Sequence, residues 1–156
     1  MAEQEGTLPR PSFSGPAPRL LLVAAPFYRS VAAHLIAGAR AEAVACGAEA
    51  ELVEVPGALE IAPAIRMAAQ SGRYDGFVAL GCVIRGETTH YETVCEESAR
   101  GLTLLGLEGI CIGNGVLTCE DMAQAEARAN PAKMDKGGGA AAAALHLVAL
   151  KRRFGA

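Results

Sequence analysis

The chain alternates between short runs suited to β-strands and longer segments in which apolar residues recur at helical spacing. Four segments have strand length, and they span residues 20–25, 50–55, 76–84 and 109–117. The second of these alternates charged with apolar residues, and glycines interrupt the fourth at 113–115. Helical periodicity follows the first three segments, over residues 31–45, 58–70 and 91–105. The pattern predicts strands and helices in strict alternation.

The last quarter of the chain carries two more predicted helices. Thr118–Asp121 resembles a capping box and is expected to open a polar helix that ends near Arg128. Gly137–Gly139 is expected to act as a hinge before a final helix over residues 140–153. Near the other end of the chain, Ser30 is expected to cap the first helix.

We expect each of the four strands to be apolar on both faces, and such strands in alternation with helices are typical of a parallel sheet covered by helices on both faces. The predicted fold class is therefore α/β, a three-layer α/β/α arrangement around a four-stranded parallel sheet. A single domain is expected over residues 19–156. Residues 1–18 hold four of the chain's eight prolines and two large apolar side chains. That segment is expected to be a flexible Pro-rich N-terminal arm.

Candidate binding groups follow the predicted strands. The segments after the four strands are 26–28, 56–60, 84–90 and 114–118. They contain an aromatic ring, a carboxylate, hydroxyls and an imidazole. Ligands of parallel sheets bind beyond the C-terminal ends of the strands, so we expect all four segments to lie along one edge and to form one site.

The third of these segments is the most informative. From Gly81 it passes through Arg85-Gly86 into a helix that begins near Thr88. A strand that turns through glycine into a helix N-terminus presents unpaired backbone N–H groups and the positive end of the helix dipole, and both favour anions. Thr89 and His90 add a hydroxyl and a titratable ring. The segment therefore predicts a phosphate-sized anion site beside a group that can carry protons.

Each of these residues has a purely structural explanation when it is taken alone. Phe27 can be a core aromatic, Glu60 can complement a helix dipole, and His90 can cap a helix. Cations near the fourth helix can also pair with a helix terminus: Arg128, Lys133 and Lys136. Their shared placement on strand-end segments, or just after the fourth strand, favours the functional interpretation.

Composition narrows the classes of function. Hydrophobic residues make up 51% of the 156 residues and charged residues 20%, which is typical of a globular domain. The net charge of −3 offers no basic face of the kind that nucleic-acid binding requires. The three histidines are widely separated and lack metal-ligand spacing, so no metal site is expected.

Cysteine usage and hydropathy predict the compartment. The five cysteines form no C-x-x-C pair and are odd in number, which favours reduced thiols and a cytoplasmic location. No basic-then-apolar signal pattern is visible at the N-terminus. The longest uncharged run, residues 137–150, is shorter than the roughly 18 residues that a transmembrane helix needs, so no membrane partner is expected.

Four stretches of the chain carry a specific combination of residues. They are Pro56–Glu60 (Pro-Gly-Ala-Leu-Glu), Gly81–Tyr91 (Gly-Cys-Val-Ile-Arg-Gly-Glu-Thr-Thr-His-Tyr), Asn114–Thr118 (Asn-Gly-Val-Leu-Thr) and Asp135–Gly137 (Asp-Lys-Gly). Together they resemble the lumazine synthase family. The resemblance extends from about Leu20 to Leu150 and implies a flavodoxin-like fold. It also implies a transferase of riboflavin biosynthesis.

The reaction that the resemblance implies is the penultimate step of that pathway. The family condenses 5-amino-6-(D-ribitylamino)uracil with 3,4-dihydroxy-2-butanone 4-phosphate. The products are 6,7-dimethyl-8-ribityllumazine, inorganic phosphate and water, and no cofactor takes part. The expected partners are therefore two small-molecule substrates.

The resemblance also assigns roles to individual residues. His90 would shuttle protons, which suits an imidazole because its reference pKa of about 6.5 lies near neutral pH. The pyrimidine and its ribityl chain would contact strand-end residues: Phe27, Ala58, Leu59, Glu60, Cys82, Val83, Ile84, Asn114 and Lys136. The phosphate of the ketone would contact Glu87, Thr88 and Arg128.

Three positions depart from the usual family pattern. Asn114 stands where many members have Phe, Glu87 replaces a small residue beside the phosphate, and Ala132 replaces a Lys. The Glu87 carboxylate must point away from the phosphate, because it would otherwise repel the anion. These departures bear on substrate affinity rather than on the type of reaction.

The family forms pentamers or multiples of pentamers, with each site shared between neighbours. The resemblance implies that one subunit supplies Phe27 to His90 and the next supplies Asn114 and Arg128. The N-terminal arm would add to a neighbour's sheet edge, and riboflavin synthase is a candidate partner. The sequence leaves pentamer, decamer and 60-subunit shell open.

Two other classes of function stay open at this point. One is a paralogue that binds a ribityl or flavin-like ligand without turnover, and the other is a mainly structural shell protein. A generic nucleotide binder is disfavoured, because no G-x-G-x-x-G loop follows the first strand.

Overall fold

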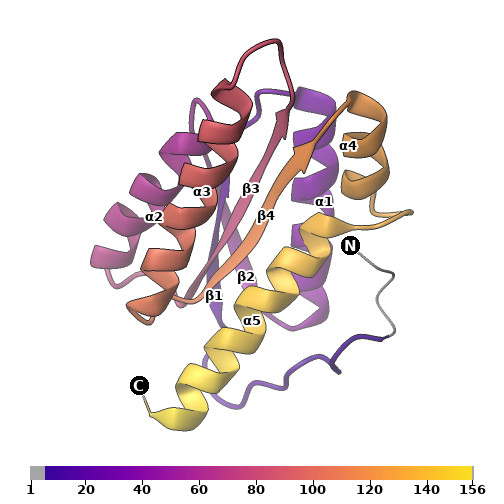
Figure 1. Cartoon of the computed structure of the whole chain (residues 1–156). Coiled ribbons are helices and arrows are strands. Elements are labelled where there is room, and N and C mark those ends of the chain that lie inside the picture. The colour runs from indigo at the N-terminus through magenta and orange to yellow at the C-terminus, as the bar shows by residue number, and fades with distance from the viewer. Residues whose placement is uncertain (1–5, 156) are drawn as a thin grey trace.

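Four parallel strands form one sheet between two layers of helices (Figure 1). The computed structural model describes residues 6–155. Its strands, in the order β2-β1-β3-β4 across the sheet, are β1 (Arg19–Ala24), β2 (Glu49–Glu54), β3 (Gly76–Ile84) and β4 (Ile112–Cys119). Its helices are α1 (Arg29–Ala45), the short 3-10 helix η1 (Ala58–Glu60), α2 (Ile61–Gln70), α3 (His90–Leu107), α4 (Met122–Ala129) and α5 (Lys136–Phe154). The predicted three-layer fold with a four-stranded parallel sheet is confirmed.

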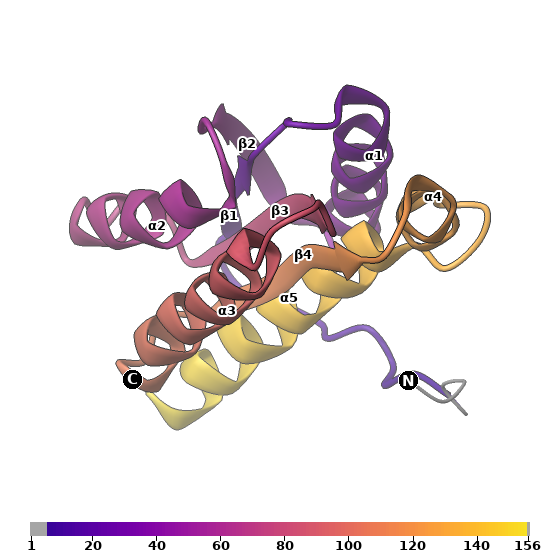
Figure 2. The ribbon, with the colours of Figure 1, turned by 45° about the horizontal axis from the view of Figure 1, so that its top comes forward.

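The helices cover the two faces of the sheet unequally, with α1, α4 and α5 on one face and α2 and α3 on the other (Figure 2). Alternate residues of β1 enter the two cores, so that Leu22 packs on the α1 side and Leu21 on the α2 side. Both side chains are buried. Strands buried on both faces need apolar residues at successive positions, which explains the continuous runs in β1 and β3.

The prediction that each strand is apolar on both faces holds for β1 and β3 but not for the outer strand β2. Leu52 is half-buried and the other five residues of β2 are exposed, although we expected both faces of every strand to be apolar. The strand lies at the edge of the sheet and carries glutamates at 49, 51 and 54. Charged side chains on an edge strand discourage uncontrolled pairing with other chains.

Glycines in β4 serve helix packing. The prediction that residues 113–115 interrupt the fourth strand is wrong, because β4 runs unbroken from Ile112 to Cys119. A Cβ atom on Gly113 would overlap the backbone carbonyl of Ala140 in α5. The glycine therefore lets α5 approach the sheet closely, which a sequence pattern cannot distinguish from a strand break.

The predicted hinge at 137–139 is also wrong, because α5 begins at Lys136 and includes all three glycines. Asp135 is the N-cap, with a left-handed backbone (φ 46°), and its carboxylate accepts a hydrogen bond from the Gly138 N–H at 3.2 Å. A Cβ atom on Gly137 would overlap the backbone of Leu35 in α1. Capping and this close packing outweigh the helix-propensity cost of glycine, about 1 kcal/mol per residue.

We expect Asp135→Ala to lower the free energy of unfolding by about 1 kcal/mol, because the variant loses the cap. Asp135→Asn keeps the acceptor and tolerates the left-handed backbone. Burial raises the pKa of Asp135 above its ordinary value. A raised pKa in the folded state favours the protonated form. The stability that protonation of Asp135 adds to the folded state is therefore present at pH values below the unfolded-state pKa, and it is lost as the pH rises through the folded-state pKa. Urea unfolding at several pH values should show the wild type gaining stability relative to Asp135→Asn as the pH falls through this range.

Two caps lie at other residues than those predicted. Tyr28, not Ser30, is the N-cap residue of α1, and the Ser30 hydroxyl instead donates to Glu126 of α4 at 3.0 Å. The capping box of α4 is shifted along the chain from Thr118–Asp121. Asp121 accepts from the Gln124 N–H, and the Gln124 side chain accepts from the Glu120 N–H, both at 2.8 Å.

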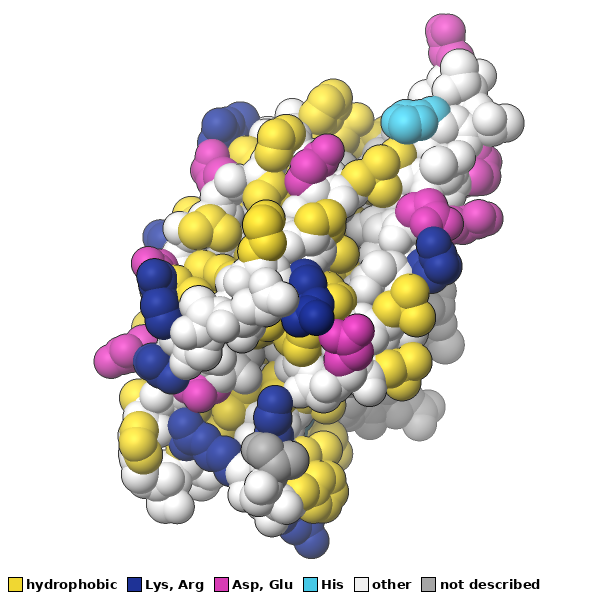
Figure 3. Space-filling model, turned by 90° about the vertical axis from the view of Figure 1, so that its left-hand side faces the viewer, with side chains coloured by type: hydrophobic (Ala, Val, Ile, Leu, Met, Phe, Trp, Pro, Cys, Tyr) yellow, Lys and Arg dark blue, Asp and Glu magenta, His cyan; other side chains and the backbone are white. Residues whose placement is uncertain are grey.

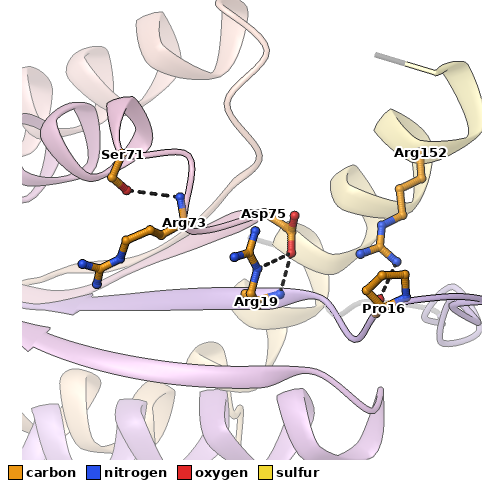
Figure 4. Close-up of polar contacts among 6 residues, drawn as sticks. All are labelled: Pro16, Arg19, Ser71, Arg73, Asp75 and Arg152. Carbon is orange, nitrogen blue, oxygen red and sulfur yellow. Dashed lines mark hydrogen bonds and ion pairs between the residues drawn. The ribbon is translucent and has the colours of Figure 1, made fainter.

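The described part of the N-terminal segment, residues 6–18, lies against its own chain. Arg10 donates two hydrogen bonds to the Glu42 carboxylate of α1, each at 3.0 Å. Phe13 packs against the core on the α1 and α5 side, with the Arg152 guanidinium 5.3 Å from its ring centre. Arg152 also donates to the Pro16 carbonyl (Figure 4). Residues 1–5 of the expected arm lie outside the described residues.

Two absences can be stated for residues 6–155. None of the helices there combines the length and the apolar character that crossing a membrane demands. Over the same range, no three His, Cys, Asp or Glu side chains come together as a metal site.

Candidate active site

The segments that follow β1 and β2, together with the last three residues of β3, line one cavity of about 320 Å³ at the C-terminal edge of the sheet. Its walls come from those three segments and from the first turns of α3: Ala25, Phe27, Tyr28, Gly57, Ala58, Leu59, Glu60, Cys82, Val83, Ile84, His90 and Val94. The prediction that strand ends would meet at one edge is confirmed for these three segments. The volume suits a small molecule.

The fourth predicted segment does not reach this cavity. Residues 114–118 lie inside β4, which ends at Cys119. The Asn114 carboxamide is exposed and accepts a hydrogen bond from the Val116 N–H at 2.9 Å. The prediction was wrong because the glycines that flank Asn114 were interpreted as the end of the strand.

Most of the predicted site residues come together in the cavity. Eight of them line it: Phe27, Ala58, Leu59, Glu60, Cys82, Val83, Ile84 and His90. Five others are not part of its lining: Glu87, Thr88, Asn114, Arg128 and Lys136. Glu87 and Thr88 are exposed in the loop just before α3, whereas Asn114, Arg128 and Lys136 belong to β4, α4 and α5.

An aromatic pair forms one wall of the cavity. The rings of Phe27 and Tyr28 meet edge to face, with centroids 5.0 Å apart and an interplanar angle of 72°. Phe27 is 73% exposed, which is unusual for a large apolar side chain and leaves its ring face free. This wall can stack against a flat ring.

The floor of the cavity offers backbone hydrogen-bonding groups, because β3 extends beyond its neighbour. Pairing with β1 ends at Ala24 opposite Leu80, and the Leu80 carbonyl accepts from the Ala25 N–H at 2.9 Å. Since successive residues of a strand direct their backbone groups to opposite sides, those of Cys82 and Ile84 point to the same side as Leu80, past the end of β1. They can therefore bind the polar edge of a ligand.

The side chain of Cys82 is poorly placed to act as a nucleophile. Its side chain is buried on the α1 side of the sheet. Burial raises the pKa of this thiol to about 12, so it stays protonated at neutral pH.

His90 enters the cavity from the first residue of α3. No side chain caps this helix at Thr89, and the His90 N–H makes a long contact of 3.3 Å to the Thr88 hydroxyl. The loop over residues 86–89 is exposed. A long helix with an exposed, weakly capped N-terminus supports the predicted anion site beside the imidazole.

Charge in the cavity is limited to one carboxylate and one imidazole. Glu60 ends η1, which begins after the Gly57 turn, and the Glu60 N–H donates to the Gly57 carbonyl at 3.1 Å. The cation expected near the anion site, Arg128, is half-buried on α4 and donates to the Gln124 carbonyl at 3.2 Å. Among the described residues, no lysine or arginine lines the cavity as a partner for a phosphate.

Four lining residues were assigned no individual role from the sequence: Ala25, Tyr28, Gly57 and Val94, although Tyr28 and Gly57 belong to the predicted strand-end segments. Two of them carried a usable signal. Tyr28 follows Phe27 directly, and Val94 lies four positions after His90, on the same face of α3.

A second cavity, of about 330 Å³, lies at the opposite end of the strands and includes Arg19, Glu51, Arg73 and Tyr74 in its walls. Three of its charged groups, Arg19, Glu51 and Arg73, already have partners. Arg19 pairs with Asp75 at 3.5 Å, as Figure 4 shows, and Arg73 lies 3.8 Å from Glu51. This cavity contains none of the predicted site residues, so the cavity at the C-terminal edge is the better candidate.

The family model and the individual relatives that match this chain carry the same description. Residues 17–152 match the family described as 6,7-dimethyl-8-ribityllumazine synthase. A protein of that name from Erythrobacter litoralis is 57% identical over 138 residues, which cover 88% of this chain and 99% of the relative. Another, from Jannaschia sp., is 51% identical over 146 residues, covering 94% and 82%. A third, from Novosphingobium aromaticivorans, is 54% identical over 136 residues, covering 87% and 98%.

Proposed function

The chain belongs to the 6,7-dimethyl-8-ribityllumazine synthase family, and from this premise we propose that it catalyses the penultimate step of riboflavin biosynthesis. In this reaction, 5-amino-6-(D-ribitylamino)uracil condenses with 3,4-dihydroxy-2-butanone 4-phosphate to give 6,7-dimethyl-8-ribityllumazine, inorganic phosphate and water. The observation that carries the proposal is the single cavity that joins Phe27, Glu60 and His90 from three separate strand ends. The reaction needs no cofactor.

The pyrimidine substrate binds against the aromatic wall. Phe27 stacks on the flat ring, and the free backbone groups of Cys82 and Ile84 meet its polar edge, with Val83 between them. The η1 segment is suited to the ribityl chain, because the Glu60 carboxylate accepts hydrogen bonds from sugar hydroxyls while Ala58 and Leu59 pack against its carbons. The lining of the cavity supports this orientation.

The phosphorylated ketone binds at the start of α3. Backbone N–H groups of Glu87 and Thr88, and the Thr88 hydroxyl, face the phosphate, with the helix dipole adding to the attraction. This arrangement brings the ketone carbon next to the amine of the pyrimidine and close to His90. Imine formation, phosphate loss and ring closure each move a proton, and the imidazole is placed to carry it.

A neighbouring subunit completes the site by supplying Asn114 and Arg128. These residues are not part of the cavity lining of their own chain, and no lysine or arginine among the described residues lines that cavity. The α2 and α3 side of the molecule also exposes apolar side chains, among them Met67, Leu104 and Leu107 (Figure 3). An apolar face of this kind fits a subunit interface, and the homopentamer or a multiple of it is the proposed assembly.

The remaining expectations are part of the same proposal. Residues 19–156 act as one domain, which the family match over 17–152 supports, with residues 1–18 as an arm. The five thiols are free, which supports a reducing, cytoplasmic location. That the arm adds to a neighbour's sheet edge, and that riboflavin synthase is a partner, stay predictions.

The proposal is tested by mixing the purified chain with both substrates. We expect lumazine absorbance to appear together with an equal amount of inorganic phosphate. Light scattering on the same sample should report a mass that is a multiple of five chains. A protein that binds the pyrimidine without forming lumazine would contradict the proposed function.

A further inference from the structure

One guanidinium joins three segments at the base of the loop that precedes His90. Arg85, the first residue after β3, donates from Nε to Glu120 Oε2 at 2.7 Å and from Nη1 to Glu92 Oε1. Its guanidinium carbon lies 4.3 Å from the centre of the Tyr91 ring. We refer to Arg85, Tyr91, Glu92 and Glu120 as the Arg85 cluster. Within residues 6–155, no other arginine pairs with carboxylates from two different segments.

The cluster encloses the loop from both ends. Arg85 comes directly before Gly86–Thr89, and Tyr91 and Glu92 lie in the first turn of α3 directly after His90. Glu120 ties the same guanidinium to the end of β4, next to the hydrogen bond from the Arg85 N–H to the Cys119 carbonyl at 3.0 Å. The loop therefore spans two points that one side chain holds together.

Little else holds this loop in the described structure. Its residues are exposed, α3 has no side-chain cap, and the Thr88 hydroxyl makes a contact of 3.3 Å. The ion pairs of the cluster are themselves partly exposed, with side-chain exposures of 39% for Arg85, 45% for Glu92 and 56% for Glu120. Exposed ion pairs contribute little to overall stability, so their effect should be local.

We propose that Arg85 is a positioning residue, which fixes the loop and the first turn of α3 so that the backbone N–H groups and His90 face the phosphorylated ketone together. The inference rests on the proposed function, because it assigns a new residue to the same site. Arg85 acts through Glu92, Glu120 and Tyr91 and does not touch the substrate.

Arg85 and Glu92 each stabilise the charged form of the other. The hydrogen bonds that Arg85 donates to Glu120 and Glu92 raise the pKa of Arg85, and the hydrogen bond from Arg85 lowers the pKa of Glu92. The second carboxylate oxygen of Glu92 is buried and has no hydrogen-bond partner in the described part of the chain. The orientation of this carboxylate therefore depends on Arg85.

A charge effect could mimic positioning, and the two make opposite predictions for Glu92. If Arg85 merely offset negative charge near the phosphate, Glu92→Gln would remove a carboxylate and improve binding of the anion. If the cluster positions the loop, Glu92→Gln loosens the contact with Arg85 and weakens binding. The sign of the Glu92→Gln effect therefore separates the explanations.

The test compares Arg85→Met, Arg85→Lys, Glu92→Gln and the double variant Arg85→Met/Glu92→Gln in the full chain. Arg10→Met is the matched control, because Arg10 also donates two hydrogen bonds to carboxylate oxygens, in its case both on Glu42, but does not line the cavity. We expect Arg85→Met to raise KM for the ketone and lower kcat, with kcat/KM falling about tenfold, less than the roughly 100-fold that a 1 Å misplacement can cost. KM for the pyrimidine should stay unchanged.

Further outcomes separate a failure of the positioning role of Arg85 from a failure of the proposed enzymatic function. Glu92→Gln should shift KM in the same direction, the double variant should be no worse than Arg85→Met, and Arg85→Lys should recover part of the loss. Calorimetric binding of inorganic phosphate should weaken in Arg85→Met and not in Arg10→Met. Kinetics and phosphate binding of Arg85→Met that equal those of Arg10→Met, or tighter binding in Glu92→Gln, would overturn the inference. A wild-type chain that binds phosphate but forms no lumazine would instead refute the proposed function.

Discussion

His90→Ala should lower kcat by about 100-fold, near the low end of the roughly 10²- to 10⁴-fold typical of acid–base groups, and leave measurable turnover. His90 is the one imidazole among the described residues that line the cavity, so its loss removes the proposed proton carrier. Amine and ketone react slowly without a catalyst, and holding them together supplies much of the acceleration. The measurement is steady-state lumazine formation with both substrates saturating.

His146→Ala is the control for this prediction. His146 is half-buried on α5 and does not line the cavity, so its loss should leave kcat unchanged. Complete loss of turnover in His90→Ala, with pyrimidine binding intact, would mean that the imidazole does more than carry protons. Unchanged kcat would remove His90 from the mechanism.

Arg128→Ala should weaken the apparent affinity for the phosphorylated ketone and change kcat much less. A hydrogen bond between charged groups contributes about 1.5–3 kcal/mol, which corresponds to roughly 10- to 150-fold in the apparent dissociation constant. Arg128→Lys retains the charge without the planar fork and should recover part of the loss. Unchanged KM for the ketone in Arg128→Ala would contradict the assigned role.

The same variant tests whether the site is shared. If one subunit supplies His90 and its neighbour supplies Arg128, assemblies that contain both His90→Ala and Arg128→Ala chains hold some sites with neither substitution. Co-expressed mixtures should then exceed the average activity of the two separate variants. Activity equal to that average would place both residues of each site in the same chain.

Hydrophobic periodicity was sufficient to predict the architecture, but it did not predict where two backbones pack closely against each other. The runs of β1 and β3 predicted buried parallel strands because such strands need apolar residues on both faces. Glycine has two opposite uses, since it can end an element or allow close packing. At Gly113 and Gly137 the second applies, because α5 packs against the backbones of β4 and α1. Local sequence contains no information about that neighbour.

The residues of the candidate site also fall into those that the sequence could place and those that it could not. Strand-end residues such as Phe27, Glu60 and His90 could be assigned to one edge, because parallel topology brings those ends together. The positions of Asn114 and Arg128 relative to the cavity could not be read from spacing, whereas the spacing of Tyr28 from Phe27 and of Val94 from His90 did carry a usable signal. The contacts of Arg85 were likewise invisible, because its carboxylate partners lie 7 and 35 positions away.

The sequence by itself determined the fold class, the family and the edge of the sheet at which the chemistry is expected. Alternating periodicity and a few specific turns carry that information, and both are local properties of the chain. Only the tertiary structure decided which residues share a cavity and how the loop before His90 is held. It also revealed that Arg128 does not line the cavity of its own chain. Those facts depend on distances between segments far apart in the chain, which folding alone brings together.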